Sequence, residues 1–419
     1  MLETESNKKG WIITIVGALF FFYNILQINL MTALNHEILA EFQTTTTKIS
    51  LLSSWSFYAN VLTILPAGLL VDRFSVKKIM MINLFVAVIG TLIFAFAPFL
   101  FIASIGRFIC GITMSFGLLA CLKLASYWLP SNEMARASSI IISIGMLGGV
   151  FAQVVVNLMR EAFGWRAAVF FVALIGVLIA LILLLVIKDA KKEEIITERA
   201  EKLSIFESLK TIMAEKQNWL SGFFICLINL PISVLGALFG ISYLVQVHRL
   251  TYMASAGIIS MLFIGVIVGS PIFGYLSDKL QRRKPPMILG AFLCLFLMLV
   301  ILYMPNIQSG FLYLLFFLLG FTSASQVIGF PVITESNRPR VSATATGLAV
   351  LIIAGVGYGV ALPLVGWILD FNLAKWAARG LEVPGAAFFR AFTVIPLGLF
   401  IGIIMAILMK ETRCKSIVN

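Results

Sequence analysis

Two charged turns of nearly identical layout interrupt the long apolar stretches of this chain. The first covers residues 68–78 (GLLVDRFSVKK) and the second covers residues 274–284 (GYLSDKLQRRK). Their leading glycines and their aspartates, Asp72 and Asp278, lie 206 residues apart (274 − 68 and 278 − 72) in a chain of 419 residues. Because this spacing is close to half of the chain, it predicts that one half of the protein repeats the other.

The apolar stretches are long enough to cross a membrane. Hydrophobic residues make up 60% of the chain and charged residues 12%, about half the charged share of a soluble domain. Since about 20 apolar residues span a bilayer as a helix, we predict an all-α membrane protein with twelve transmembrane helices. The predicted spans are roughly 11–34, 48–71, 77–97, 99–126, 136–159, 166–187, 218–246, 251–275, 286–304, 309–333, 343–369 and 387–409.

The positive charges are distributed unevenly between the two sides of these spans. When the N-terminus is placed in the cytoplasm, seven of the 31 Lys and Arg residues lie on the outer side and two, Arg107 and Lys123, lie within a span. All the others lie in cytoplasmic loops, as the positive-inside rule requires. The net charge of +12 therefore reflects topology and contact with membrane lipid, and we expect both termini in the cytoplasm and no nucleic-acid partner.

Features of an enzyme are missing from the sequence. The five cysteines are scattered, with neither metal-ligand spacing nor a disulfide framework. There is also no nucleophile–base pair and no phosphate-binding loop. We therefore predict a protein that is not an enzyme and that uses no metal or cofactor. The first apolar run has the length of a span and lacks a cleavage pattern, so we expect a first transmembrane helix and no signal peptide.

One long polar segment divides the chain near its middle. It carries charges of both signs at helical spacing, which is typical of a helix lying on a surface. We predict an N-terminal six-helix bundle over residues 1–187, a cytoplasmic linker with an amphipathic helix over 188–217, and a C-terminal six-helix bundle over 218–419.

Taken together, these motifs resemble those of the major facilitator superfamily, over essentially the whole chain. Residues 68–78 fit the family pattern G-x-L-x-D-R-x-x-x-K-K, with Ser75 where a glycine is usual, and residues 274–284 are a looser copy. Arg107 with Gly111 resembles the R-x-x-x-G element of the fourth span, residues 130–136 resemble the loop that follows it, and residues 164–166 resemble the lead into the sixth span. The resemblance implies two six-helix bundles related by a parallel repeat, with a substrate site between them near the midplane of an inner membrane. We expect a monomer.

The charged turns contain the candidate gating residues. A carboxylate at a helix end can pair with a guanidinium and accept backbone N–H groups, and in the family such an arrangement resembles a latch between the halves. The alternative is that these charges only cap helices and fix topology. The predicted gating residues are Asp72, Arg73 and Arg136 in the first half and Asp278 and Arg340 in the second.

Polar residues inside the spans are candidates for substrate contact, because ionisable groups at membrane depth are costly. Arg107 and Lys123 lie about 160° apart on an ideal helix, so both can face a cavity only if the helix is distorted. Otherwise the Lys123 ammonium reaches the membrane surface. Gln153, Asn157 and Arg160 share one face of the fifth span, with interhelical hydrogen bonding as the alternative.

The remaining candidates lie on other spans. In the family, spans 1 and 7 line the cavity together. The residues predicted to contact substrate there and on spans 10 and 11 are Tyr23, Asn24, Gln27, Asn229, Gln326 and Tyr358.

All nineteen acidic residues fall in loops or at span ends, so the predicted cavity is neutral to positive. That favours anionic or zwitterionic solutes. We predict a secondary active transporter for a small polar solute such as a carboxylate, an amino-acid-like compound or a carboxylate siderophore, working by alternating access. Protons are a candidate coupling ion, entering with the substrate or through Glu37. The alternatives are a drug or metabolite efflux transporter and, more remotely, a non-transporting receptor or scaffold.

Overall fold

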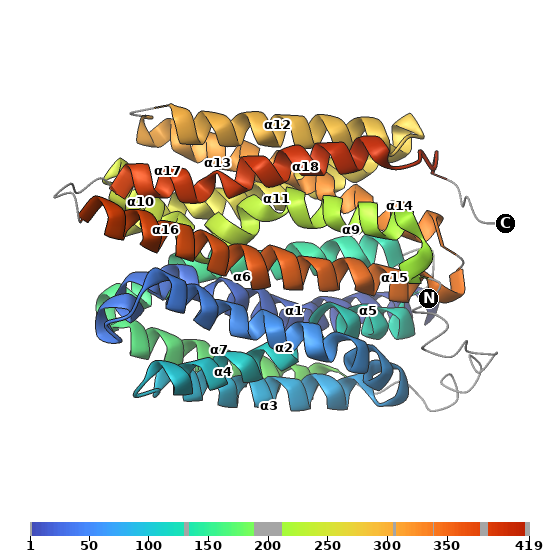
Figure 1. Ribbon diagram of the computed structural model, residues 1–419. Helices are drawn as coiled ribbons and strands as arrows, with labels where there is room; N and C mark the ends of the chain where they lie inside the picture. Colours follow the sequence, from blue (N-terminus) through green and yellow to red (C-terminus); the bar gives the residue numbers. More distant parts are fainter. Residues whose placement is uncertain are drawn as a thin grey trace. The chain divides into compact units, whose positions relative to one another are not determined.

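The computed structural model describes residues 2–129, 134–187, 212–304, 307–337, 339–377 and 384–414. Within these ranges every regular element is a helix (Figure 1), which confirms the predicted all-α class. The chain forms two compact units, one of residues 1–44 and 52–198 and the other of residues 45–51 and 199–419. The division falls in the predicted linker 188–217, most of which lies outside the described residues, so its amphipathic helix stays a prediction.

The first unit is built around one long N-terminal helix. This helix, α1, packs against α5, α6 and α7, while α3 packs against α4 and α7. The helices of this unit are α1 (Leu2–Glu41), most of α2 (Thr46–Arg73), α3 (Val76–Ala95), α4 (Leu100–Met114), α5 (Gly117–Trp128), α6 (Met134–Phe163) and α7 (Trp165–Val186).

The second unit contains more helix irregularities than the first. Short non-α helical segments, η3, η4 and η5, interrupt three of its long helices, and α12 packs beside α13 and α18 (Figure 1). Its elements are α9 (Lys216–Ile228), η3 (Ile232–Phe239), α10 (Gly240–His248), α11 (Tyr252–Leu280), α12 (Lys284–Tyr303), α13 (Ser309–Ser323), η4 (Ala324–Ile328), α14 (Gly329–Glu335), α15 (Pro339–Ile352), η5 (Ile353–Val360), α16 (Ala361–Ala377), α17 (Pro384–Phe392) and α18 (Val394–Leu408).

These helices are long and apolar enough to cross a membrane. Among the described residues ten candidate spans meet that test, and an eleventh is formed if α9 and the helix over Ile232–His248, bent by 43°, are counted as one. Helix α2, 28 residues long, covers the predicted span 48–71. These spans, taken together with α2, are consistent with the twelve expected from the sequence.

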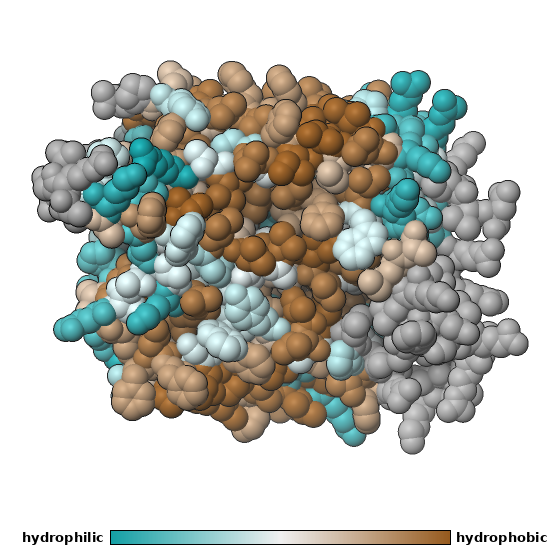
Figure 2. Space-filling view, in the orientation of Figure 1, coloured by the Kyte–Doolittle hydropathy of each residue, from teal (hydrophilic) through white to brown (hydrophobic). Residues whose placement is uncertain are grey.

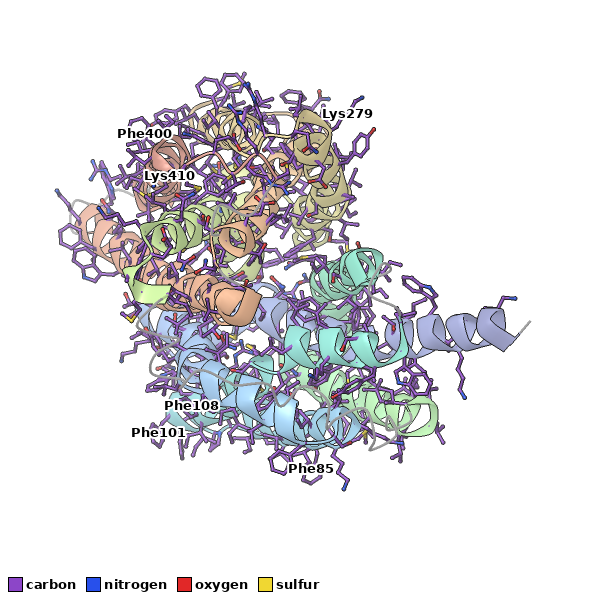
Figure 3. All side chains as sticks on the ribbon, turned by 90° about the vertical axis from the view of Figure 1, so that its right-hand side faces the viewer. Phe85, Phe101, Phe108, Lys279, Phe400 and Lys410 are labelled. Atoms are coloured by element: carbon purple, nitrogen blue, oxygen red, sulfur yellow. The ribbon has the colours of Figure 1, made fainter. Side chains whose placement is uncertain are left out.

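The outer faces of the helices are hydrophobic. In the first unit Phe85 and Phe101 point outward with 67% and 73% of their surface exposed, and Phe400 does so in the second unit (Figure 3). The visible face is hydrophobic over much of its middle, and hydrophilic side chains gather toward its ends (Figure 2). Large apolar side chains are costly to expose to water, so this surface is suited to lipid.

The internal repeat is visible in how glycines let helices approach. A Cβ atom on Gly111 of α4 would lie 2.0 Å from the backbone oxygen of Ser56 on α2, and one on Gly320 of α13 would lie 1.9 Å from that of Leu262 on α11. Ser56 and Leu262 are separated by the same 206 residues (262 − 56) as the two charged turns. The glycines themselves lie 209 residues apart (320 − 111), so each unit uses a glycine at nearly the same point to bring equivalent helices into backbone contact.

The first turn of α2 belongs to the second unit. There Asp370 accepts hydrogen bonds from the backbone nitrogens of Thr46 and Thr47, at 3.0 and 2.6 Å, and from the Thr47 hydroxyl. A carboxylate is a favourable partner for the unpaired N–H groups of a helix N-terminus. Because α2 has no acidic residue in its own first turn, Asp370 supplies the cap from 324 residues away.

Candidate functional site

Arg107 is buried inside the first unit. Its side chain comes from α4 and is fully buried, with 0% of its surface exposed. One guanidinium nitrogen, Nη1, donates to the backbone oxygen of Gln27 at 2.9 Å. Among the described residues, Nε and Nη2 have no hydrogen-bond partner, and no carboxylate forms an ion pair with this arginine.

The residues that surround Arg107 form one hydrogen-bonded group. The Gln27 amide donates to the hydroxyl of Thr91 at 2.7 Å, and the Tyr23 hydroxyl lies 3.4 Å from the same oxygen. Thr91 in turn donates to the backbone of α3 and contacts the thiol of Cys110. We call Tyr23, Gln27, Thr91 and Arg107 the Arg107 cluster. The structure thus brings three of the predicted substrate residues together, and it adds Thr91, which the sequence analysis missed.

A buried guanidinium with two unpaired donors is unusual, because a charge buried without a partner is costly. The donors that remain on Arg107 are suited to a carboxylate, sulfonate or phosphate oxygen, since a guanidinium binds such groups through two parallel hydrogen bonds. The Arg107 cluster is therefore suited to hold an anion. As the guanidinium is closed to solvent here, an anion can reach it only if surrounding side chains or helices move.

The polar face of α6 is also buried, but its arginine, unlike Arg107, has carboxylate partners. Arg160 pairs with Glu37 of α1 and lies 3.2 Å from Glu161 of its own helix. Asn157 donates to the backbone of Gln153 at 2.6 Å, and both side chains are fully buried. Since two carboxylates compensate Arg160, its charge is less available to a substrate than that of Arg107.

Lys123 and Arg107 lie on the same 29-residue apolar span, Leu100–Trp128. The helix breaks at Ser115 and Phe116, between α4 and α5. The helix is therefore not ideal between the two residues, and whether both face one cavity stays a prediction. Lys123 is half-buried, with its ammonium 5.6 Å from the centre of the Tyr127 ring.

A second polar contact missed by the sequence analysis lies at this break. The hydroxyl of Ser115 accepts from the Asn60 amide at 3.0 Å and lies 2.7 Å from that of Thr63. Both partners come from α2. The only signal in the sequence was three common polar residues, which occur often in membrane helices without functional meaning.

In the second unit the three predicted substrate residues lie where helices are irregular. Asn229 is the C-cap of α9, two residues before Pro231, Gln326 lies in η4, and Tyr358 lies in η5. Both η4 and η5 pack against α9. Irregular turns inside long helices often mark functional sites, so these residues form a second candidate contact region. Asn24 of α1, by contrast, donates to the backbone of Phe20 on its own helix.

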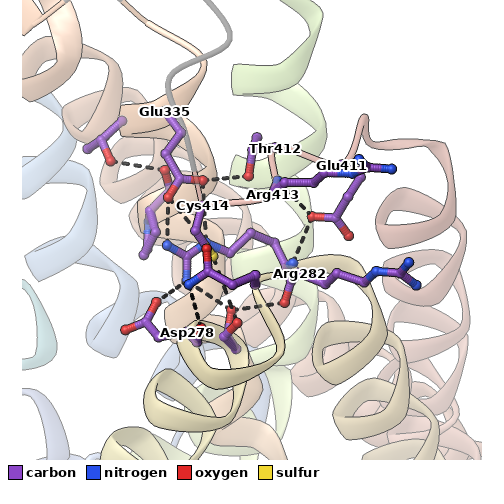
Figure 4. Close-up of polar contacts among 12 residues, drawn as sticks. Asp278, Arg282, Glu335, Glu411, Thr412, Arg413 and Cys414 are labelled. Atoms are coloured by element: carbon purple, nitrogen blue, oxygen red, sulfur yellow. Dashed lines mark hydrogen bonds and ion pairs between the residues drawn. The ribbon is translucent and has the colours of Figure 1, made fainter.

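The charged turn of the second unit is a network centred on Arg283. Its guanidinium forms ion pairs with Asp278 and Glu335, both at 2.6 Å, and also donates to Ser277 (Figure 4). Burial alone would lower the pKa of Arg283, but the hydrogen bonds that it donates to Glu335 and then to Asp278 outweigh this effect and raise the pKa above its usual value. The sequence analysis named Asp278 and missed Arg283 and Glu335, because Arg283 is one of several basic residues in the turn.

The structure does not describe the side chains of the other predicted gating residues. Asp72, Arg73, Arg136 and Arg340 lie within α2, α6 and α15, but their side chains fall outside the described ones. The pairing of Asp72 with Arg136 and of Asp278 with Arg340 therefore stays a prediction. In the described residues, the arginine beside Asp278 is Arg283.

The motif at residues 164–166 has a clear structural role. Arg166 binds Glu41 at 2.6 Å and donates to the backbone oxygens of Ala95 and Ala97, while Trp165 donates to Glu41. These contacts join the start of α7 to the ends of α1 and α3. The motif thus fixes helix ends within the first unit.

The chain belongs to the Major Facilitator Superfamily, whose family model matches residues 15–362. The division into two helical units, the repeated charged turn and the repeated glycine contacts are what this membership leads one to expect. The sequence-based assignment is therefore confirmed.

Several curated relatives are transporters from bacteria. The chain is 26% identical over 262 residues to the sialic acid transporter NanX of Escherichia coli, a match that covers 59% of this chain and 60% of the relative. It is 25% identical over 167 residues to the probable sulfoacetate transporter SauU of Cupriavidus necator, covering 40% and 39%. It is 22% identical over 371 residues to the gentisate transporter of Corynebacterium glutamicum, covering 86% and 81%. The matches to the first two span less than two thirds of those proteins.

Solved structures share the fold. A point mutant of the nucleoside transporter NupG superposes with a TM-score of 0.75 at 15% identity, covering 94% of this chain and 99% of that one. A bacterial homologue of the human lysosomal transporter Spinster, in an inward-facing and occupied conformation, superposes with a TM-score of 0.70 at 16% identity, covering 95% and 94%.

Proposed function

We propose that this protein is a secondary active transporter that moves a small organic anion or zwitterion across the inner membrane by alternating access, with Arg107 binding an acidic group of the solute. The observation that carries the proposal is the buried guanidinium of Arg107, which has two donors without partners among the described residues. The rest of the Arg107 cluster supplies neutral hydroxyl and amide groups for orientation.

The relatives support an acidic solute. NanX, SauU and the gentisate transporter are named for sialic acid, sulfoacetate and gentisate, and a probable galactarate/D-glucarate transporter, GudP of Escherichia coli, is 23% identical over 368 residues. All of these compounds carry a carboxylate or sulfonate group. A guanidinium binds either group through paired hydrogen bonds.

The test is a ligand screen on the purified full-length protein in detergent, followed by thermal unfolding. A ligand that binds the native state at 100 times its Kd adds about 2.7 kcal/mol of stability. We expect carboxylates and sulfonates to raise the unfolding temperature and lipophilic cations to leave it unchanged. Stabilisation by lipophilic cations alone would instead support the efflux alternative.

Two substitutions connect the screen to Arg107. Arg107→Gln should weaken binding of the stabilising anion about 10- to 100-fold, because a hydrogen bond to a charged group contributes about 1.5–3 kcal/mol. Arg107→Lys keeps the charge and should retain part of the binding, even if Arg107→Gln folds poorly. Arg166→Gln, which removes an arginine with other partners, is the matched control. Unchanged anion binding in Arg107→Gln would exclude the proposed contact.

A further inference from the structure

The second unit carries a pocket that the proposed transport site does not explain. It lies at the charged end of the unit, where the turn leading into α12 meets the segment that follows α18. Its volume is about 690 Å³. Asn229, Gln326 and Tyr358 do not line it, so it is separate from the candidate substrate residues of this unit.

Three basic residues and one acidic residue form the polar rim of this pocket: Arg282, Lys284, Arg413 and Glu411. The carboxylate of Glu411 accepts backbone hydrogen bonds from Arg283 at 2.7 Å, Lys284 at 3.0 Å and Arg413 at 3.2 Å (Figure 4). It thereby caps the N-terminus of α12. Burial alone would raise the pKa of Glu411, but these N–H groups outweigh it and lower the pKa. The Glu411 carboxylate is thus already hydrogen-bonded within the protein.

The three basic side chains of the rim differ in their hydrogen bonds to the protein. Lys284 donates to the backbone oxygen of Ile407 at 2.7 Å. The guanidinium groups of Arg282 and Arg413 make no hydrogen bond or ion pair with the residues that the structure describes, and both side chains are exposed. Three cations against one acid that is already hydrogen-bonded leave the rim positive, with two guanidinium groups available to an anion.

The opposite wall of the pocket is apolar. It is formed by Pro285, Ile288, Leu289 and Phe292 of α12, which recur at the spacing that places side chains on one helical face. Leu289 and Phe292 are 52% and 60% exposed, and Phe296, one turn further on, is 56% exposed. This face therefore continues from the charged turn along a helix that is long and apolar enough to cross a membrane.

We propose that this pocket binds an anionic phospholipid, with its phosphate at Arg282 and Arg413 and an acyl chain along the face of α12. Guanidinium groups bind phosphate oxygens in pairs, and basic pockets at helix ends recognise anionic lipid headgroups. The apolar wall favours a lipid over a soluble phosphate, which would leave it uncovered. Because Glu411 already accepts three backbone hydrogen bonds and is outnumbered by three basic residues, the rim favours an anionic headgroup over a zwitterionic one.

Native mass spectrometry of the full-length protein in detergent tests this site. The protein is offered equal amounts of palmitoyl-oleoyl phosphatidylglycerol and the matching phosphatidylcholine. We expect preferential retention of phosphatidylglycerol, and we expect Arg282→Gln/Arg413→Gln to reduce its bound fraction about tenfold. Lys216→Gln/Lys279→Gln removes the same charge from exposed positions that do not line the pocket, and it should bind as the wild type does.

Two further arms separate the sources of the phosphate. Glycerol 1-phosphate, the soluble headgroup without acyl chains, should not displace the lipid at millimolar concentration. Phe292→Ala should weaken lipid binding without changing any charge. Equal binding of the two lipids, equal loss in the two double variants, or displacement by glycerol 1-phosphate would each overturn the proposal.

Discussion

At the scale of single residues, the ion pair between Arg160 and Glu37 is open to a direct test. Both groups are partly or fully shielded, with 7% and 25% of their side chains exposed. Glu37→Gln removes one carboxylate partner of the buried guanidinium, and removing one partner of a shielded pair is more costly than removing both. We expect a loss of about 1–3 kcal/mol, the usual penalty for a buried polar group that loses a hydrogen-bond partner, measured as a lower unfolding temperature in detergent.

The double variant Glu37→Gln/Arg160→Gln is the control for this ion pair. It removes both charges, so it should recover part of the stability that Glu37→Gln loses. If Glu37→Gln unfolds at the wild-type temperature, the pair contributes nothing. Where transport can be followed, the same variant also tests whether protons enter through Glu37, since a glutamine cannot carry one.

Residues with rare chemistry could be predicted from the sequence, and those with common chemistry could not. A charge inside an apolar run is conspicuous, and Arg107 also matched a family element. Thr91 and Ser115 carry hydroxyls of a kind that usually bonds to its own helix. Only the fold reveals that Thr91 also contacts Tyr23 and Gln27 and that Ser115 hydrogen-bonds to α2. Arg283 could not be distinguished in the sequence from the basic residues beside it.

At the scale of helices, the repeated glycine contacts predict a matched pair of defects. Gly111→Ala and Gly320→Ala each place a Cβ about 2 Å from a backbone oxygen of the neighbouring helix, which a side-chain rotation cannot relieve. We expect each to cost about 1–3 kcal/mol through overpacking, seen as reduced thermal stability. Gly347→Ala, which meets nothing within 4 Å, should be neutral or slightly stabilising because alanine favours helix. Equal effects in all three variants would contradict the close packing.

The cap of α12 should make stability depend on pH. The folded-state pKa of Glu411 is lowered, so its contribution is fully present above the ordinary carboxyl value of about 4.3 and is lost as the pH falls through the folded-state value below it. Glu411→Gln should reduce stability at pH 7 by about 1 kcal/mol, the usual effect of losing a cap. Thermal unfolding of both proteins should show this gap narrowing below pH 4, and a constant gap would contradict the role of the carboxylate.

Helix positions followed from the sequence more readily than helix interruptions. Apolar length located the spans because the bilayer sets it. The break between α4 and α5 has no proline, and it is held by Ser115 contacts to α2 that depend on tertiary packing. The break after Asn229 was easier to predict from the sequence, since Pro231 lacks the N–H that continues a helix.

At the scale of the whole molecule, the duplication was the most dependable prediction. The interval of 206 residues between the charged turns is also the interval between Ser56 and Leu262, whose backbones receive the packing glycines. A repeat fixes the fold because each copy must bury equivalent helices. It does not fix the solute, because the copies differ at their polar positions: Arg107 in the first unit has no arginine counterpart among Asn229, Gln326 and Tyr358.

The orientation of the chain in the membrane can be tested without knowing the solute. Helix α12 has four basic residues at or just before its start, Lys279, Arg282, Arg283 and Lys284, while residues 304–309 at its other end contain none. The positive-inside rule places the basic end in the cytoplasm. Alkaline phosphatase, which is active only outside the cytoplasm, should therefore be active when fused after Gln308 and inactive when fused after Asn419, where green fluorescent protein should fluoresce. The opposite pattern would reverse the topology, and it would move the proposed lipid pocket to the outer leaflet.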